Sequence, residues 1–351
     1  MKELKIGYWP LSSDLKSPGD RRRLVFWAKA RGHTVVTDLS KKVDVVVASE
    51  NSDFNSSLLV KKNIPIIFDL VDAYLSPRNP IDDIARGLAK KSAGLISGRA
   101  KPFSHHIRDF CSRSDAVICS SPEQEVLIKP YTTNTHVILD SHDEIPFIEI
   151  GTRSKLSNNE IRILWEGQPA TIRGIGGIAS ELYQLSETSD LRFDFVTDQK
   201  YYKFMNKYIE GDTLELISKD LPQISSNANI IDWSISNLVT SAQKCKIAII
   251  PIDLRVPIQR LKPENRLLIM WRLGLPCLTT ASPAYIRVSQ IAGANAICET
   301  PQDWLENFNR IITDQSFAQK EVLLGQNYLN EFHAKEILLR KWDTAFESVI
   351  G

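Results

Sequence analysis

Short runs of almost continuous apolar residues constrain the fold of this chain more than any other feature of its sequence. Residues 43–48, 64–69 and 247–252 are such runs, each about as long as one strand. Strands of this composition are buried on both faces, which is typical of parallel sheets covered by helices on each side. Segments with helical periodicity lie between the runs. The sequence therefore predicts an α/β fold with parallel sheets.

The alternation of strands and helices fills residues 1–150 and then begins again. In this first part we expect a helix at residues 20–31, ended by Gly32, among strands at residues 4–8, 34–37, 43–48, 64–69, 115–120 and 136–139. Residues 140–160 are polar, contain Pro146 and Gly151, and have few periodic apolar residues, which indicates a linker between two domains.

The second part, residues 151–330, has expected strands at residues 161–165, 192–196, 229–231, 247–252, 276–280 and 294–298. Residues 331–351 read as an amphipathic terminal helix that could pack on either domain. We therefore predict two doubly wound, Rossmann-like domains that face a cleft. Ligands of such sheets bind outside the carboxyl ends of the strands, so the loops at those ends are the candidate sites.

The charge balance argues against a nucleic-acid partner. The 351 residues contain 43 Lys and Arg against 42 Asp and Glu, so the chain has no strong net field. Basic clusters at residues 21–23, 61–62, 90–91 and 99–101 are interpreted as solvated helix faces or ends. Together they leave room for weak peripheral contact with a membrane.

The cysteines and the apolar runs indicate the cellular compartment of the protein. The five cysteines are scattered and include no C-x-x-C pair, which argues against a zinc or redox site and fits a reducing compartment. The N-terminus lacks the apolar core of a signal peptide, and the longest apolar runs are too short to span a bilayer. We expect a cytoplasmic protein, with the inner membrane face as a possible peripheral site.

Residues 262–285 contain the clearest candidate site. Lys262 precedes a predicted helix at residues 264–273, with Pro263 at its first position and Gly274 as its left-handed stop. A buried strand and a second helix start at Ser282 follow. A lysine beside the free N–H groups of a helix start can bind an anion. The alternative is a surface lysine before an ordinary helix.

Several segments form a recognisable series. They are ILWEG at 163–167 with Arg173-Gly174, CKIAIIPI at 245–252, KPENR at 262–266 with GLP at 274–276, and DAVICSS at 115–121. Taken together, they resemble the glycosyltransferases with two Rossmann domains (GT-B), close to the large family 4, or group 1. The resemblance covers most of the chain. It also implies that the terminal helix, with Trp342, returns to the N-terminal domain.

The resemblance implies that residues 151–330 bind a nucleotide-sugar. The implied donor-binding residues are Gly167, Arg173, Trp233, Lys262, Glu264, Asn265, Arg266 and Ser282. Arg173 and Lys262 would stabilise the leaving diphosphate without a metal ion or other cofactor. Arg255 and Arg260 are rival cations, and Arg266 could instead form a structural ion pair. Trp233 could instead belong to the core.

The N-terminal domain is expected to bind the acceptor. Gly19 and Arg21 lie in the first strand–helix loop, where the family has a loop that reaches the donor phosphates. Asp72 follows the strand at residues 64–69 and could serve as the general base of an inverting reaction. One position departs from the family: Ile269 stands where many members carry a glutamate that binds donor hydroxyls, which leaves the ribose contact unexplained.

The predicted activity is therefore metal-independent transfer of a sugar from a nucleotide-sugar to a hydroxyl of a glycan or lipid-linked glycan, as in bacterial surface polysaccharide synthesis. The missing glutamate leaves a non-catalytic, nucleotide-sugar-binding GT-B subunit as the alternative. A nicotinamide-dependent oxidoreductase is disfavoured, because the glycines at 174, 176 and 177 lack the G-x-G-x-x-G spacing.

Overall fold

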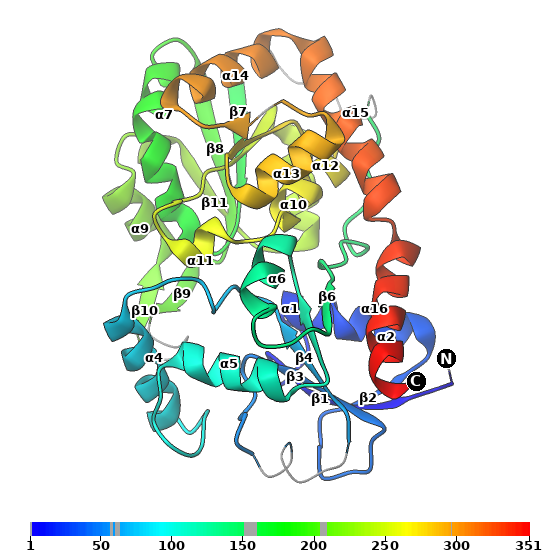
Figure 1. The fold of residues 1–351 in the computed structure, drawn as a ribbon. Helices are drawn as coiled ribbons and strands as arrows, with labels where there is room; N and C mark the ends of the chain where they lie inside the picture. The colour runs from blue at the N-terminus through cyan, green and yellow to red at the C-terminus, as the bar shows by residue number, and fades with distance from the viewer. Residues whose placement is uncertain (1, 57–58, 60–63, 151–159, 204–208, 296) are drawn as a thin grey trace. The chain divides into compact units, whose positions relative to one another are not determined.

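A computed structural model describes residues 2–56, 59, 64–150, 160–203, 209–295 and 297–351 (Figure 1). The chain forms two compact units. Unit 1 comprises Met1–His142, Leu261–Pro263 and His333–Gly351, and unit 2 comprises Asp143–Arg260 and Glu264–Phe332. Part of the predicted linker, residues 151–159, and the basic pair at residues 61–62 lie outside the described residues.

Unit 1 contains a parallel sheet of six strands in its described part, in the order β2-β1-β3-β4-β5-β6. The strands are β1 (Lys5–Trp9), β2 (Thr34–Val36), β3 (Val45–Ser49), β4 (Ile66–Leu70), β5 (Ala116–Cys119) and β6 (Thr135–Val137). The described helices are α1 (Pro18–Arg21), α2 (Leu24–Arg31), α4 (Pro80–Ser92), α5 (Phe103–Arg113), α6 (Pro122–Ile128) and α16 (Lys335–Ile350).

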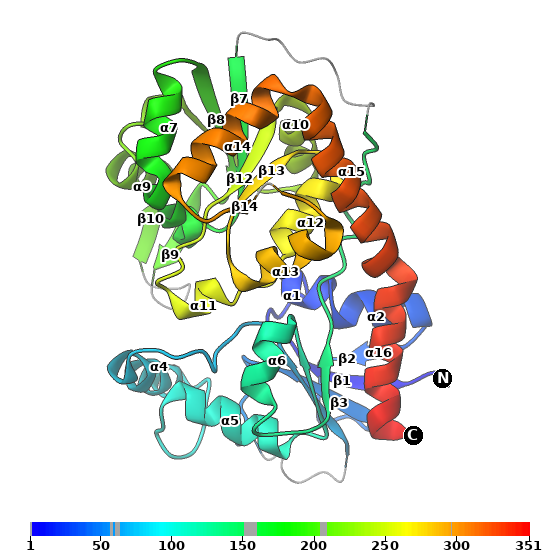
Figure 2. The same ribbon diagram turned by 45° about the horizontal axis from the view of Figure 1, so that its top comes forward.

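The last helix of the chain completes the core of unit 1. The ring of Trp342 stacks on that of Trp27 at 6.0 Å between centroids, and Phe346 lies 4.1 Å from Trp27. Trp27 Nε1 donates to Asp343 at 2.7 Å, and Arg31 forms an ion pair with the same carboxylate. Helix α16 lies beside α2 in both ribbon views (Figure 2).

Unit 2 contains a second parallel sheet, whose six described strands have the order β11-β8-β7-β12-β13-β14. The strands are β7 (Glu160–Glu166), β8 (Asp190–Thr197), β11 (Ala228–Asp232), β12 (Ile247–Ile250), β13 (Cys277–Thr280) and β14 (Ile297–Cys298). The described helices are η1 (Pro169–Ile178, 3-10), α7 (Ala179–Ser186), α9 (Thr213–Asp220), η2 (Ser225–Asn227, 3-10), α10 (Ile235–Lys244), α11 (Pro257–Arg260), α12 (Asn265–Arg272), α13 (Pro283–Ala292), α14 (Pro301–Thr313) and α15 (Gln315–Phe332).

The two doubly wound sheets confirm the predicted fold class, and the differences are local. The helix expected at residues 20–31 is two helices, α1 and α2, which Gly32 ends in the left-handed conformation. Pro263 is not the first helical residue, because α12 begins at Asn265 with Glu264 as its N-cap. The antiparallel pair β9 (Lys200–Lys203) and β10 (Ile209–Asp212) was not predicted.

Two expectations about composition can be compared with the described residues. All five cysteines are buried, free thiols, as small apolar residues would be. Within the described ranges, every helix is too short or too polar to cross a bilayer.

Candidate functional site

In the sheet of unit 2, the order in which the chain adds strands reverses between β7 and β12. These strands are neighbours, and the chain adds β8 and β11 on one side and β13 and β14 on the other. Such a switch point leaves a crevice at the carboxyl ends, where ligands of α/β sheets bind. Helix η1 reaches this place, because a Cβ on Gly174 would lie 2.5 Å from the backbone oxygen of Pro251, directly after β12. Gly174 therefore permits an approach that no larger residue allows.

Glu166, the last residue of β7, stands at this switch point. Its Oε1 accepts a hydrogen bond from Trp233 Nε1 at 2.9 Å. Its backbone oxygen accepts one from Nη1 of Arg266 at 3.3 Å. The second carboxylate oxygen, Oε2, is buried and has no hydrogen-bond partner among the described residues. Three segments that are distant in sequence thus meet at one residue, Glu166.

The start of α12 supplies both polar and structural residues. Asn265 has a buried side-chain oxygen without a described partner. Arg266 is half-buried and lies beside Tyr285, whose pKa is raised to about 12 by burial against the opposing effect of Arg266. Glu264 is completely buried and bonded to Arg287 at 3.0 Å. Its carboxylate therefore ties α12 to α13 and presents no exposed oxygen to a ligand.

The remaining predicted donor residues differ in exposure. Ser282 is buried, and its Oγ accepts the N–H of Tyr285, so it is the N-cap of α13. Gly167 follows Glu166, where a Cβ would lie 3.1 Å from the ring of Trp165. Arg173 is 73% exposed and paired with Asp220 at 3.1 Å, so no described contact brings it to Glu166.

The rival cations Arg255 and Arg260 are also exposed, and Arg255 pairs with Asp253. Among the described contacts of the predicted cations of unit 2, that of Arg266 is with Glu166 at the switch point.

Unit 1 has its own switch point, between β1 and β3. The loop after β1 folds over Asp20, which accepts from Tyr8 Oη at 2.6 Å and from the backbone N–H groups of Leu11 and Ser12. A Cβ on Gly19 would lie 2.3 Å from Leu11, so this glycine permits close packing. Arg21 donates to the backbone oxygen of Lys16. These contacts stabilise the conformation of the loop between β1 and α2.

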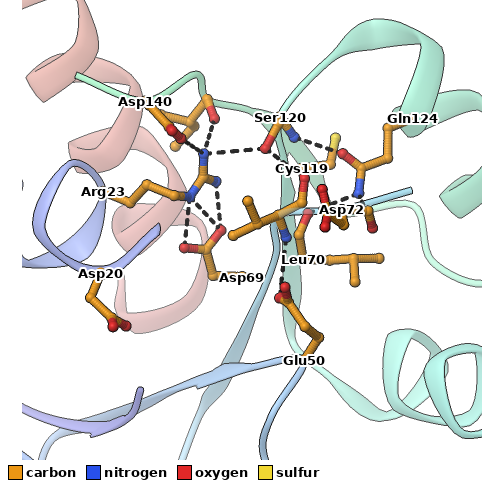
Figure 3. A network of polar contacts seen from close by, with 12 residues as sticks. Asp20, Arg23, Glu50, Asp69, Leu70, Asp72, Cys119, Ser120, Gln124 and Asp140 are labelled. Atoms are coloured by element: carbon orange, nitrogen blue, oxygen red, sulfur yellow. Dashed lines mark hydrogen bonds and ion pairs between the residues drawn. The ribbon is translucent and has the colours of Figure 1, made fainter. Parts of the chain in front are cut away.

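Arg23 corrects the interpretation of residues 21–23 as a solvated cluster. It is fully buried, with Asp69 at 2.6 Å and Asp140 at 3.2 Å (Figure 3). Its Nη1 also donates to Ile138 O at 2.7 Å. The pKa of Asp69 is raised, because burial outweighs the pull of Arg23. The carboxyl ends of β4 and β6 are therefore joined by a buried ionic network that sequence periodicity does not reveal.

Glu50 and Asp72 follow β3 and β4 and differ in burial. Burial, with the nearby charge of Asp72, raises the pKa of Glu50 to about 8. Asp72 is partly exposed and accepts a hydrogen bond from Lys262 Nζ at 2.7 Å. The predicted base and the predicted donor cation therefore form an ion pair within unit 1, to which Leu261–Pro263 belongs. An anion that binds Lys262 must share it with Asp72 or displace Asp72.

The described residues include no group of three or more His, Cys, Asp or Glu side chains that could hold a metal ion.

The sequence matches no protein-family model and no curated protein. Solved structures do match it. HepE from Anabaena, in complex with UDP and glucose, has a TM-score of 0.64 at 10% identity, over 99% of this chain and 100% of that chain. WaaG, a glycosyltransferase involved in lipopolysaccharide biosynthesis, has a TM-score of 0.59 at 12% identity, over 97% and 98%. TarM has a TM-score of 0.57 at 12% identity, over 86% of this chain and 54% of TarM, so the chain spans about half of that protein.

This chain has the GT-B fold. In both units of this GT-B chain, polar side chains gather where the strand order reverses. Glu166 was missed at the sequence level, although it lies within the quoted segment ILWEG. A carboxylate directly after an apolar strand was the available signal. Its partners Trp233 and Arg266 could not be inferred, because they follow other strands whose order in the sheet the sequence does not specify.

Proposed function

We propose that this protein is a glycosyltransferase that moves a sugar from a nucleoside-diphosphate donor to a hydroxyl group. The observation that carries the proposal is the switch point of unit 2, where Arg266 adjoins Glu166. The helices α12 and α13 follow β12 and β13, so their N-terminal N–H groups lie at the same edge of the sheet. UDP with glucose in HepE, and UDP in TarM, support a nucleotide-sugar as the ligand class.

The chemistry requires stabilisation of a diphosphate leaving group, whose negative charge grows as the glycosidic bond breaks. A guanidinium and helix N–H groups can supply this without a metal ion. Arg266 takes this role in our proposal, with Lys262 as a second cation once it parts from Asp72. Asp72 would accept the proton of the acceptor hydroxyl in an inverting reaction, and a retaining reaction would not need it.

The proposed acceptor is a glycan or a lipid-linked glycan. The name of WaaG, with its role in lipopolysaccharide biosynthesis, and the glycan ligands of TarM, fondaparinux and GlcNAc-glycerol, support this class. The alternative is a subunit that binds a nucleotide-sugar without turnover. Release of a nucleoside diphosphate in the presence of any acceptor would exclude that alternative.

The first experiment is a thermal-shift screen with UDP-, GDP-, TDP- and CMP-sugars. Ligand binding stabilises the folded protein by RT ln(1 + [L]/Kd). We expect stabilisation by one of the three nucleoside-diphosphate sugars, with a smaller shift in Arg266→Ala and an unchanged shift in Arg255→Ala, whose arginine is exposed and paired with Asp253. Absence of a shift with all three nucleoside-diphosphate sugars would contradict the proposal, and a shift of undiminished size in Arg266→Ala would remove Arg266 from the site.

We also propose peripheral membrane contact through α4. Ile81, Ile84 and Leu88 recur at helical spacing and are 73%, 46% and 48% exposed. Lys91 and Arg99, both exposed, follow on the same helix and the loop after it. An apolar stripe flanked by cations suits an anionic lipid surface.

Co-sedimentation with vesicles tests this surface. We expect binding to vesicles containing anionic lipid and weaker binding after Ile84→Ser with Leu88→Ser. The control is Leu214→Ser, an equally exposed leucine of unit 2. Equal binding of both variants would contradict a role for α4.

A further inference from the structure

The resemblance to family 4 implies a donor-binding glutamate at position 269, where this chain has an apolar residue. Ile269 occupies that position and is 2% exposed, within the buried face of α12. An apolar side chain with no exposed surface cannot replace the missing contact. A nucleotide donor bound to this protein therefore needs another hydrogen-bond acceptor for its ribose.

Glu166 has the properties of such an acceptor. Its Oε2 is buried and lacks a described partner, which is costly for a carboxylate oxygen unless a ligand supplies the donor. Its Oε1 is held by the indole N–H of Trp233, so the side chain is already fixed in place. It also ends the strand at the switch point, where a ligand of this sheet is expected.

Neighbouring carboxylates are already engaged. Asp232 accepts from the amide of Gln199, and Asp253 pairs with Arg255. Glu264 is enclosed with Arg287. Glu166 thus differs from them in having a buried oxygen without a described partner.

The position of Arg266 identifies the part of the ligand that reaches Glu166. Its guanidinium contacts the backbone of Glu166, so a diphosphate bound by Arg266 lies next to the carboxylate. In a nucleoside diphosphate the ribose is joined directly to that diphosphate, and its hydroxyls are hydrogen-bond donors. Asn265, the residue before Arg266, offers a second buried oxygen without a described partner. Two acceptors beside one cation match a diol beside a phosphate.

We propose that Glu166 binds the ribose hydroxyls of the donor nucleotide and so takes the role of the carboxylate that is absent at position 269. Trp233 is a positioning residue that orients Glu166. This inference rests on the proposed nucleotide-sugar function and adds to it the group that recognises the ribose.

Calorimetric titration with matched nucleotides tests the assignment. The probes are UDP with 2′,3′-dideoxy-UDP, and GDP with 2′,3′-dideoxy-GDP. A hydrogen bond to a charged group corresponds to roughly tenfold to a hundredfold in affinity. The ratio of the Kd of the dideoxynucleotide to the Kd of its ribonucleotide should therefore be roughly ten to a hundred for the native protein. In Glu166→Gln the uncharged amide oxygen stays with the indole N–H of Trp233 and the –NH2 group faces the ligand, so the charge-assisted hydrogen bonds are lost and this ratio should fall toward one. Trp233→Phe should lower the ratio partly.

Arg266→Ala is the matched control, because it should weaken both nucleotides alike and leave their ratio unchanged. An unchanged ratio in Glu166→Gln, with nucleotides still bound and the melting temperature of the variant preserved, would overturn the assignment. So would an effect of Glu166→Gln that appears with the nucleotide-sugar and not with the nucleoside diphosphate, which would place the carboxylate against the sugar. No binding of either ribonucleotide to the native protein would overturn the assignment of Glu166, and together with no shift by any nucleoside-diphosphate sugar in the thermal screen it would reject the donor site itself.

Discussion

At the scale of single residues, the guanidinium of Arg23 is enclosed in unit 1 and shared by Asp69 and Asp140. Removing one partner of a buried ion pair leaves an uncompensated charge, which costs about 3–5 kcal/mol. We therefore expect Arg23→Met to lower the free energy of unfolding of unit 1 by about that amount, measured by urea denaturation. Adding Asp69→Asn should recover part of the loss.

The control for this prediction is Arg255→Met. Arg255 also pairs with an aspartate, but its side chain is 89% exposed, so water replaces the partner. The denaturation midpoint should not change. A loss as large as that of Arg23→Met would contradict the burial argument.

The raised pKa of Glu50 predicts how the free energy of unfolding depends on pH. Burial raises its pKa to about 8 from 4.5, so the native state holds a proton that the unfolded state has released between these values. Stability therefore falls as pH rises from about 5 to 8, by an amount on the order of 1–4 kcal/mol. Glu50→Gln, which has no charge to bury, should remove this loss and be the more stable protein at pH 8.

Denaturation at pH 5, 6, 7 and 8 checks this prediction, with the exposed Asp82→Asn as control. The range ends at pH 8 because burial lowers the pKa of Lys90 to about 8, from 10.5. That shift makes stability rise with pH above 8 and would mask the effect of Glu50. Parallel pH profiles of Glu50→Gln and the native protein would show that Glu50 is ionised throughout.

At the scale of elements, the core strands were predictable because they are apolar at nearly every position, as in β3 and β12. The helix η1 was not, because glycines at 174, 176 and 177 indicate a loop, while contacts with β12 and α9 hold the segment as a 3-10 helix. For the candidate site, the sequence predicted only its place in the fold, at the loops after the carboxyl ends of the strands. The hydrogen-bonded pairs of side chains in the site, such as Glu166 with Trp233, depend on strand order and could not be predicted.

Helix η1 provides a matched pair of substitutions at the switch point. A Cβ on Gly174 would meet Pro251 O at 2.5 Å, whereas one on Gly176 would meet nothing within 4 Å. Gly174→Ala must therefore shift η1 away from β12, at a cost of about 1–3 kcal/mol, and should weaken nucleotide binding. Gly176→Ala should change neither. Melting temperature and calorimetry with UDP measure both effects, and equal behaviour of the two variants would show that η1 does not depend on this contact.

At the scale of the whole molecule, unit 1 is built from the two ends of the chain. Its sheet is made by residues before His142, but Trp342 and Phe346 of α16 fill its core against Trp27. All of unit 2 lies between these two segments in sequence. Folding of unit 2 shortens the loop that must be closed before α16 can join unit 1, which lowers the entropic cost of that step.

This connectivity predicts that a chain ending at Phe332 keeps unit 2 folded and loses the native state of unit 1. Burial of a residue such as Trp342 is worth about 3–5 kcal/mol by alanine substitution, and the shortened chain loses the ion pair of Arg31 with Asp343 as well. Hydrogen exchange should show rapid exchange in β1 and β3 and continued protection in β7 and β12. A peptide of residues 333–351 added in excess should restore protection to β1 and β3, and the same peptide with Trp342→Ala should not. Protection of β1 and β3 in the shortened chain alone would show that unit 1 folds without α16.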